Sequence, residues 1–442
     1  MNETLWHVTV LSNLIRGYDK YTRTYSKANI PECTFQDRFF LLREGDLHHG
    51  VAKAKTLLHR LSLTENRLIA LRTTVPTHEL RDNTRTGIGI FVERGHITLN
   101  AVGWVNNDET SQPEIIPIEE ACALSLRLLH PELYPFEDLR PRSFSVLPVA
   151  KGCQAACPFC FSDASVSAEQ DQARLDLSRV RQIANIACAR GAERFVITGG
   201  GEPGLLRHEK LCALIATGTA AIGKSVLITN AHHLAQRSNM ECAQMLSDYH
   251  NAGLRVLAIS RHHHNDERSK NIMSLDTDVA AIATTWNLGR ARWPDLRLRL
   301  TCVLQRGGVD SLMEIASYVS WAAAHGIQEI CFKELYVSTS IESVYHRHAA
   351  NAWSYKHQVP LSLILKFAAR YNFRKISQLP WGSPVFAGEW CGWPIQIAAY
   401  TEPSLLWERS EGIARSWNFM ADGHCLASLE DRASEIRLPV AT

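Results

Sequence analysis

Three cysteines within eight residues carry the strongest chemical signal in this sequence. Cys153, Cys157 and Cys160 follow the spacing C-x3-C-x2-C. Cysteine thiolates that lie close together in a short loop are typical ligands of iron–sulfur clusters. Three thiolates leave one iron of a four-iron cube without a protein ligand, so that iron can bind and activate a small molecule. The spacing therefore predicts a [4Fe–4S] cluster with one open coordination position.

A zinc site is the alternative interpretation of the same cysteines. Structural zinc sites are closed by four ligands, and these thiolates supply only three. The run His262, His263 and His264 could supply a fourth ligand, but it lies about a hundred residues further along the chain. We expect that run to be a polar, solvated loop rather than a metal or proton-transfer site. The cluster is therefore the favoured prediction.

A glycine-rich turn follows the next apolar run of the sequence. Residues 195–204 read Phe-Val-Ile-Thr-Gly-Gly-Gly-Glu-Pro-Gly, which predicts a buried strand followed by a turn containing Gly200, Gly201 and Glu202. Glycines allow the backbone to approach a ligand closely, because no Cβ intervenes. A glutamate at the start of a helix, where the helix dipole favours it, is the structural alternative for Glu202.

Polar side chains also end three later apolar runs. Asn230 ends one run, and Ser260 with Arg261 ends the next. Lys333 and Glu334 end the last run, where they could either reach a substrate or form an ion pair. An ordinary surface loop is the alternative for Asn230, Ser260 and Arg261.

The elements that must position these residues alternate regularly from residue 143 onward. Helical periodicity fills the gaps between short apolar strands, for example over 177–190 and 312–324. Strand–helix alternation predicts a parallel sheet with helices outside. The reactive loops of parallel barrels leave the carboxyl ends of the strands, so the cysteine loop and the glycine turn should share one rim. We expect the six strands at residues 143–149, 194–198, 225–229, 255–260, 297–304 and 329–333.

Together these motifs resemble those of the radical S-adenosylmethionine (SAM) enzymes, over roughly residues 143–335. The cysteine spacing, with Phe159 before the last cysteine, is similar to the family's cluster loop, and residues 200–202 are similar to its GGE motif. The resemblance implies a partial (β/α)6 barrel. It also implies that the open iron binds the amino and carboxylate groups of SAM, and that Gly200, Gly201 and Glu202 meet its ammonium group. Asn230, Ser260 and Arg261 are the implied contacts to the SAM ribose or carboxylate.

The resemblance also implies a reaction. A reduced cluster passes one electron to SAM, which splits into methionine and a 5′-deoxyadenosyl radical that takes a hydrogen atom from the substrate. An electron donor such as flavodoxin or ferredoxin is the implied partner. The favoured substrate is a peptide or protein side chain, and the alternative is a small molecule that is dehydrogenated, epimerised or rearranged. A binding protein of another class, stabilised by zinc or a cluster and without catalysis, is the remaining hypothesis.

We expect an α/β protein with three parts. Residues 1–140 are expected to form an α+β domain for substrate or partner recognition, with helices over 4–25, 47–71 and 118–129 and a hairpin over 87–105. Residues 141–335 are expected to form the barrel. Residues 336–442 are expected to form a C-terminal extension with a helix near 361–371, a strand over 395–400 and a small β-hairpin over 416–426.

Composition excludes several other classes of protein. The formal net charge of +2 gives no argument for nucleic-acid or membrane binding. No apolar run approaches the ~20 residues that span a bilayer, and no signal pattern is present, so we expect a cytoplasmic protein. The twelve cysteines should then not form a disulfide framework. Cys391 and Cys425 could return a hydrogen atom to a substrate radical, but we expect both to be buried structural residues and predict no second cluster.

Overall fold

The computed structural model divides the chain into two compact units, described separately below. One unit comprises residues 1–133 with 379–383, and the other comprises residues 134–378 with 384–442. The domain boundaries expected at residues 140 and 335 remain predictions. The structure describes residues 67–71, 88–93, 96–101, 114–116, 134–161, 167, 175–338, 343–345, 347–380, 383–403, 408–409 and 411–436.

The N-terminal unit contains a four-stranded antiparallel sheet in the order β1-β2-β3-β4. The predicted hairpin is confirmed, because β2 and β3 are antiparallel neighbours and Glu93 pairs with His96. The predicted helix over 47–71 is wrong at its end, since residues 67–71 form a strand that pairs with residues 88–92. The other helices expected in this unit lie outside the described residues. The strands are β1 (Arg67–Leu71), β2 (Ile88–Glu93), β3 (His96–Ala101) and β4 (Glu114–Ile116).

The second unit contains a large sheet whose six central strands confirm the prediction. Their spatial order β11-β10-β9-β8-β7-β6 repeats the order along the chain, and every neighbouring pair is parallel. The sheet has two free ends, β12 and β17, so it is a partial barrel rather than a closed ring. The six strands are β6 (Phe144–Leu147), β7 (Phe195–Ile197), β8 (Ser225–Thr229), β9 (Leu254–Ser260), β10 (Arg297–Leu304) and β11 (Glu329–Glu334).

Strands from the C-terminal part of the chain extend this sheet at both sides. The predicted strand near 395–400 is β14, which lies parallel beside β11. The predicted C-terminal hairpin is β16 with β17, and β16 also lies parallel beside β6. The parallel sheet therefore has eight strands, two more than expected. The remaining strands are β5 (Arg140–Pro141), β12 (Arg374–Gln378), β13 (Pro384–Trp390), β14 (Trp393–Tyr400), β15 (Ile413–Ala414), β16 (Trp417–Met420) and β17 (Cys425–Leu426).

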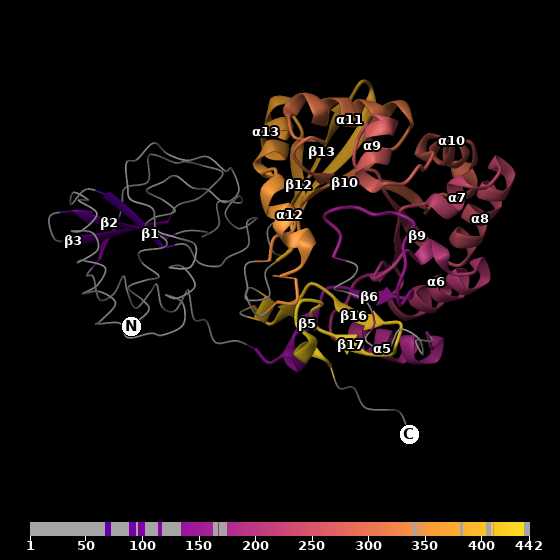
Figure 1. The fold of residues 1–442 in the computed structure, drawn as a ribbon, viewed down its shortest axis with the longest axis horizontal. Coiled ribbons are helices and arrows are strands. Elements are labelled where there is room, and N and C mark those ends of the chain that lie inside the picture. Colours follow the sequence, from indigo (N-terminus) through magenta and orange to yellow (C-terminus); the bar gives the residue numbers. More distant parts are fainter. Residues whose placement is uncertain are drawn as a thin grey trace. The chain divides into compact units, whose positions relative to one another are not determined.

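Helices follow the outer side of the curved sheet, as Figure 1 shows for α6 to α11. Several helices start at a residue whose side chain caps them, as at Ser311, whose hydroxyl accepts the Glu314 N–H at 3.2 Å. The α-helices are α5 (Leu177–Ala189), α6 (His208–Ile222), α7 (His232–Ala235), α8 (Asn239–Asn251), α9 (Asp266–Met273), α10 (Val279–Gly289), α11 (Leu312–Ala324), α12 (Ala349–His357) and α13 (Ser362–Arg370).

The two faces of the sheet differ because side chains alternate along each strand. Leu227 and Leu257 belong to the main core, which is shared with the helices. Val226, Val256 and Ala258 form a smaller cluster on the opposite, inner face. On β10 and β11 the residues that alternate with the core include Arg299 and Lys333, so the inner face also carries charged side chains.

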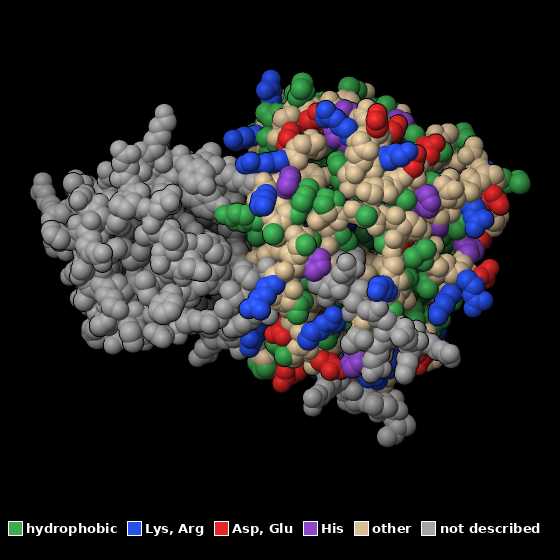
Figure 2. All heavy atoms as spheres, in the orientation of Figure 1, with side chains coloured by type: hydrophobic (Ala, Val, Ile, Leu, Met, Phe, Trp, Pro, Cys, Tyr) green, Lys and Arg blue, Asp and Glu red, His purple; other side chains and the backbone are tan. Residues whose placement is uncertain are grey.

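Acidic and basic side chains intersperse on the surface of the described part of the chain in the view of Figure 2. Among the described helices, none is both long and apolar enough to cross a lipid bilayer.

Candidate functional site

The cysteine loop leaves the carboxyl end of β6, at the rim where the sequence predicted it. The loop is fastened by its backbone: the Ala156 N–H donates to the Met273 carbonyl at 2.8 Å, and the Cys160 N–H donates to the Cys157 carbonyl at 3.1 Å. Cys153, Cys157 and Cys160 are all free thiols. The turn between Cys157 and Cys160 keeps the last two thiols close enough for their charges to interact.

The glycine turn after β7 packs directly against the start of the cysteine loop. The Glu202 N–H donates to the Gly152 carbonyl at 2.9 Å. A Cβ on Gly201 would lie 2.3 Å from the Gly152 oxygen and 2.8 Å from Val149 Cγ1, which is closer than atoms can approach. Gly201 is therefore required by the close contact of two loops that lie about fifty residues apart in the sequence.

Glu202 is buried and holds the ends of β7 and β8 together. One carboxylate oxygen accepts the Gly204 N–H at 2.8 Å and the Thr229 hydroxyl, and the other accepts the Asn230 N–H at 2.8 Å. Burial raises the pKa of this carboxyl above its ordinary value, and these hydrogen bonds oppose that shift. The side chain thus positions the rim, while its contact with the SAM ammonium group remains a prediction.

Asn230 links the end of β8 to the cysteine loop. Its Nδ2 lies 3.6 Å from Cys153 Sγ and donates to Gln154 Oε1 at 3.2 Å. Its Oδ1 accepts the His232 N–H at 2.9 Å, which fixes the orientation of the amide. The structure therefore brings Asn230 to the predicted cluster ligands, as a donor toward a sulfur.

His262 supports the same loop from the end of β9. Its ring meets Phe159 edge-on with centroids 5.0 Å apart, and the Trp353 ring lies 6.1 Å from Phe159, centroid to centroid. His262 Nδ1 accepts the Val303 N–H at 3.1 Å, and burial lowers the pKa of this imidazole to about 3. The expectation of a solvated histidine loop is wrong for His262 and His263, because both are buried. No local pattern indicated this burial, because the residues that cover these rings come from distant elements.

Ser260 and Arg261 lie in different surroundings. Ser260 pairs with Thr301 on the neighbouring strand β10 and is half-buried. The Arg261 side chain is buried and stacks 3.8 Å over the Trp321 ring, while its Nη2 donates to Asp266 Oδ1 at 2.6 Å. These contacts hold Arg261 toward α11 and α9, and its predicted role in SAM binding remains untested.

The residues of the cysteine loop fit an iron–sulfur cluster. Burial raises the pKa of the Cys157 thiol to about 12, and the neighbouring charges of Cys160 and Cys153 raise it further. Thiolates that oppose one another in this way are stabilised beside a positively charged metal centre. The Ala155 N–H lies 3.4 Å from Cys153 Sγ, on the same sulfur that Asn230 approaches. Donors toward a ligand sulfur are a recurring feature of iron–sulfur sites.

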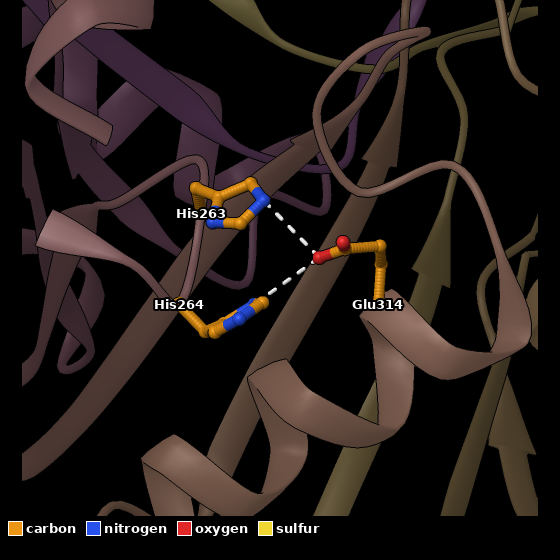
Figure 3. A group of neighbouring side chains, drawn as sticks. All are labelled: His263, His264 and Glu314. Atoms are coloured by element: carbon orange, nitrogen blue, oxygen red, sulfur yellow. Dashed lines mark ion pairs between the residues drawn. The ribbon is translucent and has the colours of Figure 1, made fainter. Parts of the chain in front are cut away.

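A second group of possible metal ligands lies beyond β9. Figure 3 shows His263 and His264 both directed toward Glu314, with nitrogen–oxygen distances of 3.1 and 3.3 Å. The Asn265 N–H donates to His263 Nδ1 at 2.9 Å, so the neutral ring carries its proton on the nitrogen that faces Glu314. Arg268 lies 3.5 Å from the same carboxylate. A proton on the nitrogen that faces Glu314, and a guanidinium that pairs with the same carboxylate, disfavour a metal ion at this position.

Charged residues gather on the opposite side of the sheet, at the ends of β11 and β14. Lys333 forms an ion pair with Glu402 rather than with Glu334, and Arg415 approaches the same Glu402 oxygen at 2.7 Å. Burial opposes ionisation of Glu402, but the two cations outweigh it and lower the pKa of this carboxyl to about 2. Sequence reasoning missed Glu402 and Arg415, because both lie in loops without a periodic pattern.

The two C-terminal cysteines differ from each other. Cys425 is buried in β17, as expected, whereas Cys391 is exposed in the turn between β13 and β14. The expectation of burial is therefore wrong for Cys391. It occupies a tight turn with a φ of 50°, and turn residues lie at the surface because their backbone needs water.

The chain was compared with known protein families and with solved structures. Residues 147–298 match the model of the Radical SAM superfamily. The fold is similar to Streptococcus suis SuiB bound to S-adenosylmethionine, with 14% identity, 70% of this chain and 65% of that chain covered, and a TM-score of 0.42. Coproporphyrinogen III oxidase (HemN) from Escherichia coli, a radical SAM enzyme, shares 13% identity, with 54% of each chain covered and a TM-score of 0.36.

This chain therefore spans slightly less than two thirds of that SuiB chain. No curated protein matches it in sequence. Radical SAM proteins use a [4Fe–4S] cluster and SAM, and the cysteine loop described above falls inside the matched segment. Residues 147–298 are a radical SAM domain.

Proposed function

We propose that this protein is a radical SAM enzyme that modifies a peptide or protein side chain. The observation that carries the proposal is the convergence of three rim loops, from β6, β7 and β8, on Cys153 and Gly152. With a [4Fe–4S] cluster and SAM bound, the site would supply a 5′-deoxyadenosyl radical that takes a hydrogen atom from the substrate.

The chain's own residues would then hold and shield the reactants. Cys153, Cys157 and Cys160 would bind the cluster, and Asn230 would donate toward the Cys153 sulfur. Gly200 and Gly201 would offer backbone to SAM, with Glu202 keeping the two strand ends in register. The other predicted contacts, at Ser260 and Arg261, remain proposals. The Phe159 contact with His262 would keep the cluster loop in place against the barrel.

The substrate class is inferred from the organisation of the chain. A unit with its own antiparallel sheet, separate from the barrel, supports recognition of something larger than the reacting group. A small-molecule substrate is the alternative, in which case that unit would bind a partner. A flavodoxin or ferredoxin would supply the electron.

Reconstitution tests the core of the proposal. We expect anaerobically purified protein to be brown, to lose its broad visible absorbance with dithionite, and to release 5′-deoxyadenosine from SAM and reductant. Colourless protein that holds one zinc ion per chain would instead support a binding protein without catalysis.

A second experiment tests the substrate class. A short peptide encoded beside this gene should show a mass change after incubation with the reduced enzyme and SAM. An unchanged peptide, together with turnover of a small-molecule extract, would favour the small-molecule alternative.

A further inference from the structure

A polar pocket lies among the loops that follow β14 and flank β16. Its lining includes Glu402, Glu408, Arg415 and Glu430, together with the aromatic ring of Tyr345. Every one of these residues lies outside the radical SAM match at 147–298. The pocket therefore belongs to the part of the chain that could distinguish this protein's substrate from others.

Among the described residues, the charges around this pocket do not balance. Three carboxylates, those of Glu402, Glu408 and Glu430, face two cations, Arg415 and Lys333. Both cations contact Glu402, so their charge is largely committed to that one residue. The other two carboxylates need a further positive charge or a proton, because an uncompensated buried charge is costly.

Glu408 is the carboxylate of this pocket with which a ligand could pair most directly. The residue is only 6% exposed, yet it lines the pocket. Its Oε1 accepts the Arg415 backbone N–H, whereas its Oε2 accepts no hydrogen bond from the described residues. Burial raises the pKa of this carboxyl to about 8; Arg415 opposes the shift, and Glu430 and Glu402 add to it. A cation that entered the pocket would favour the ionised form.

Glu430 and Tyr345 also line the pocket, and Tyr336 lies next to both. Glu430 accepts hydrogen bonds from the Tyr336 hydroxyl and, at 3.2 Å, from the Ser338 hydroxyl. Tyr345 lies at 6.3 Å from Tyr336, ring centroid to centroid, with the planes at 78°. Carboxylates beside aromatic rings favour an ammonium group, through charge and through cation–π attraction.

One aromatic residue connects the pocket to the cysteine loop. Phe161 follows Cys160 directly in the sequence and stacks on Tyr345, with centroids 4.5 Å apart and an interplanar angle of 30°. It also meets Tyr336 edge-on at 6.1 Å. The rings of Tyr345 and Phe161 would therefore lie between a group held in the pocket and Cys160, the last predicted cluster ligand.

We propose that this pocket, named here the Glu408 pocket, binds a protonated alkylamine of the substrate, such as a lysine side chain. The inference rests on the proposed function, since it names the chemical class that the same site would take. Arg415 and Lys333 hold Glu402 in place, and Glu408 and Glu430 supply the negative charge that the ammonium group neutralises.

Thermal unfolding of the reconstituted enzyme tests the proposal with n-butylammonium chloride as the probe. Sodium butyrate and 1-butanol, at equal concentration and ionic strength, serve as the anionic and neutral counterparts. We expect n-butylammonium alone to raise the unfolding temperature in a saturable way. The probe stays charged well above neutral pH, because alkylammonium groups have a pKa of about 10.4. Its apparent affinity should therefore rise by up to about tenfold per pH unit between pH 6 and 8, as Glu408 ionises.

Two variants separate the pocket from general charge effects. Glu408→Gln should weaken n-butylammonium binding about tenfold or more and remove its pH dependence, since a neutral amide cannot pair with the ammonium group. Glu411→Gln removes an exposed carboxylate three residues away and should bind the probe as the wild type does. Equal binding by both variants would overturn the proposal.

Other outcomes also decide the question. A rise in unfolding temperature with butyrate would show an anion site at Arg415 and Lys333, and no rise with any probe would show no such site; either result overturns the proposal. Release of 5′-deoxyadenosine by the same wild-type preparation is measured in parallel. Cleavage without n-butylammonium binding refutes the pocket alone, whereas absence of cleavage refutes the proposed function.

Discussion

The rim of the barrel has two sides that are built from different chemistry. On the side of β6, β7 and β8, the contacts come from backbone groups, glycines and thiols, and the one buried carboxylate, Glu202, is saturated by hydrogen bonds. At the ends of β11 and β14, ionisable side chains face each other around Glu402. The first side suits a ligand of fixed shape, and the second suits a charged group that differs from one substrate to another.

This contrast predicts which amino-acid substitutions the protein should tolerate. A backbone contact such as that between Glu202 and Gly152 cannot be altered without moving a whole loop. A charged side chain such as Glu408 can be exchanged while the fold persists. Mutations on the first side should therefore abolish chemistry, and mutations on the second side should change binding or its dependence on pH.

The largest effect is expected from Cys157→Ala. Removal of one of three ligands should abolish both cluster assembly and SAM cleavage, measured by visible absorbance and by 5′-deoxyadenosine release. Cys188→Ala, which replaces an exposed cysteine on α5, is the matched control and should retain both. Retained cleavage in Cys157→Ala would contradict the ligand assignment.

Gly201→Ala should come next. The added Cβ meets the Gly152 oxygen and must displace the cysteine loop, so we expect about a 100-fold loss of SAM cleavage and about 1–3 kcal/mol of destabilisation. Gly223→Ala places a side chain at a left-handed position with open space around it. It should cost about 1 kcal/mol of stability and leave cleavage unchanged, which separates displacement of the loop from loss of stability.

Asn230→Ala should have a smaller effect on the same side. Loss of the donor toward Cys153 and Gln154 should reduce cleavage about tenfold, in the range found for residues that support metal ligands. The cluster should still assemble, with a changed reduction potential as the direct readout. Asn287→Ala removes an amide that donates to the His325 carbonyl at 2.6 Å, away from the cysteine loop, and should change neither. An unchanged potential in Asn230→Ala would remove Asn230 from the site.

The smallest effect is expected on the charged side, in the pH dependence of stability. Burial raises the pKa of Glu408 to about 8, from an ordinary value of 4.5. Between these values the folded protein holds a proton that the unfolded chain has lost, so this residue lowers stability as pH rises, by about 1 kcal/mol per pH unit. Urea denaturation at several pH values should show a flatter profile for Glu408→Gln than for Glu411→Gln. Parallel profiles would show that Glu408 is ionised in the folded state.

Local patterns in the sequence predicted most of the barrel. Apolar strands and helical periodicity located all six central strands, and α11 begins and ends at the predicted residues. The cysteine loop and the glycine turn could be found because their residues are neighbours in the chain. The loops of a parallel barrel leave the carboxyl ends of its strands, so the cysteine loop and the glycine turn could be predicted to share one rim.

Long-range contacts could not be predicted in the same way. The sequence located β14 and β16 as strands but not their places beside β11 and β6. Glu402 and Arg415 come together only through those pairings, and neither lies in a periodic pattern. The burial of His262 likewise depends on Phe159, which lies about a hundred residues earlier.

The position of β6 between β7 and β16 has a consequence for biosynthesis. The Ser143 hydroxyl bonds to the Arg415 carbonyl across 272 residues of chain, and Trp417 pairs with Phe144 at the strand's outer edge. One edge of the strand that precedes the cysteines stays unpaired until β16, about 270 residues further along the chain, has been synthesised. Native closure of the base of the cysteine loop must therefore wait for β16, and this fold should mature slowly for its size because that contact is so distant in sequence.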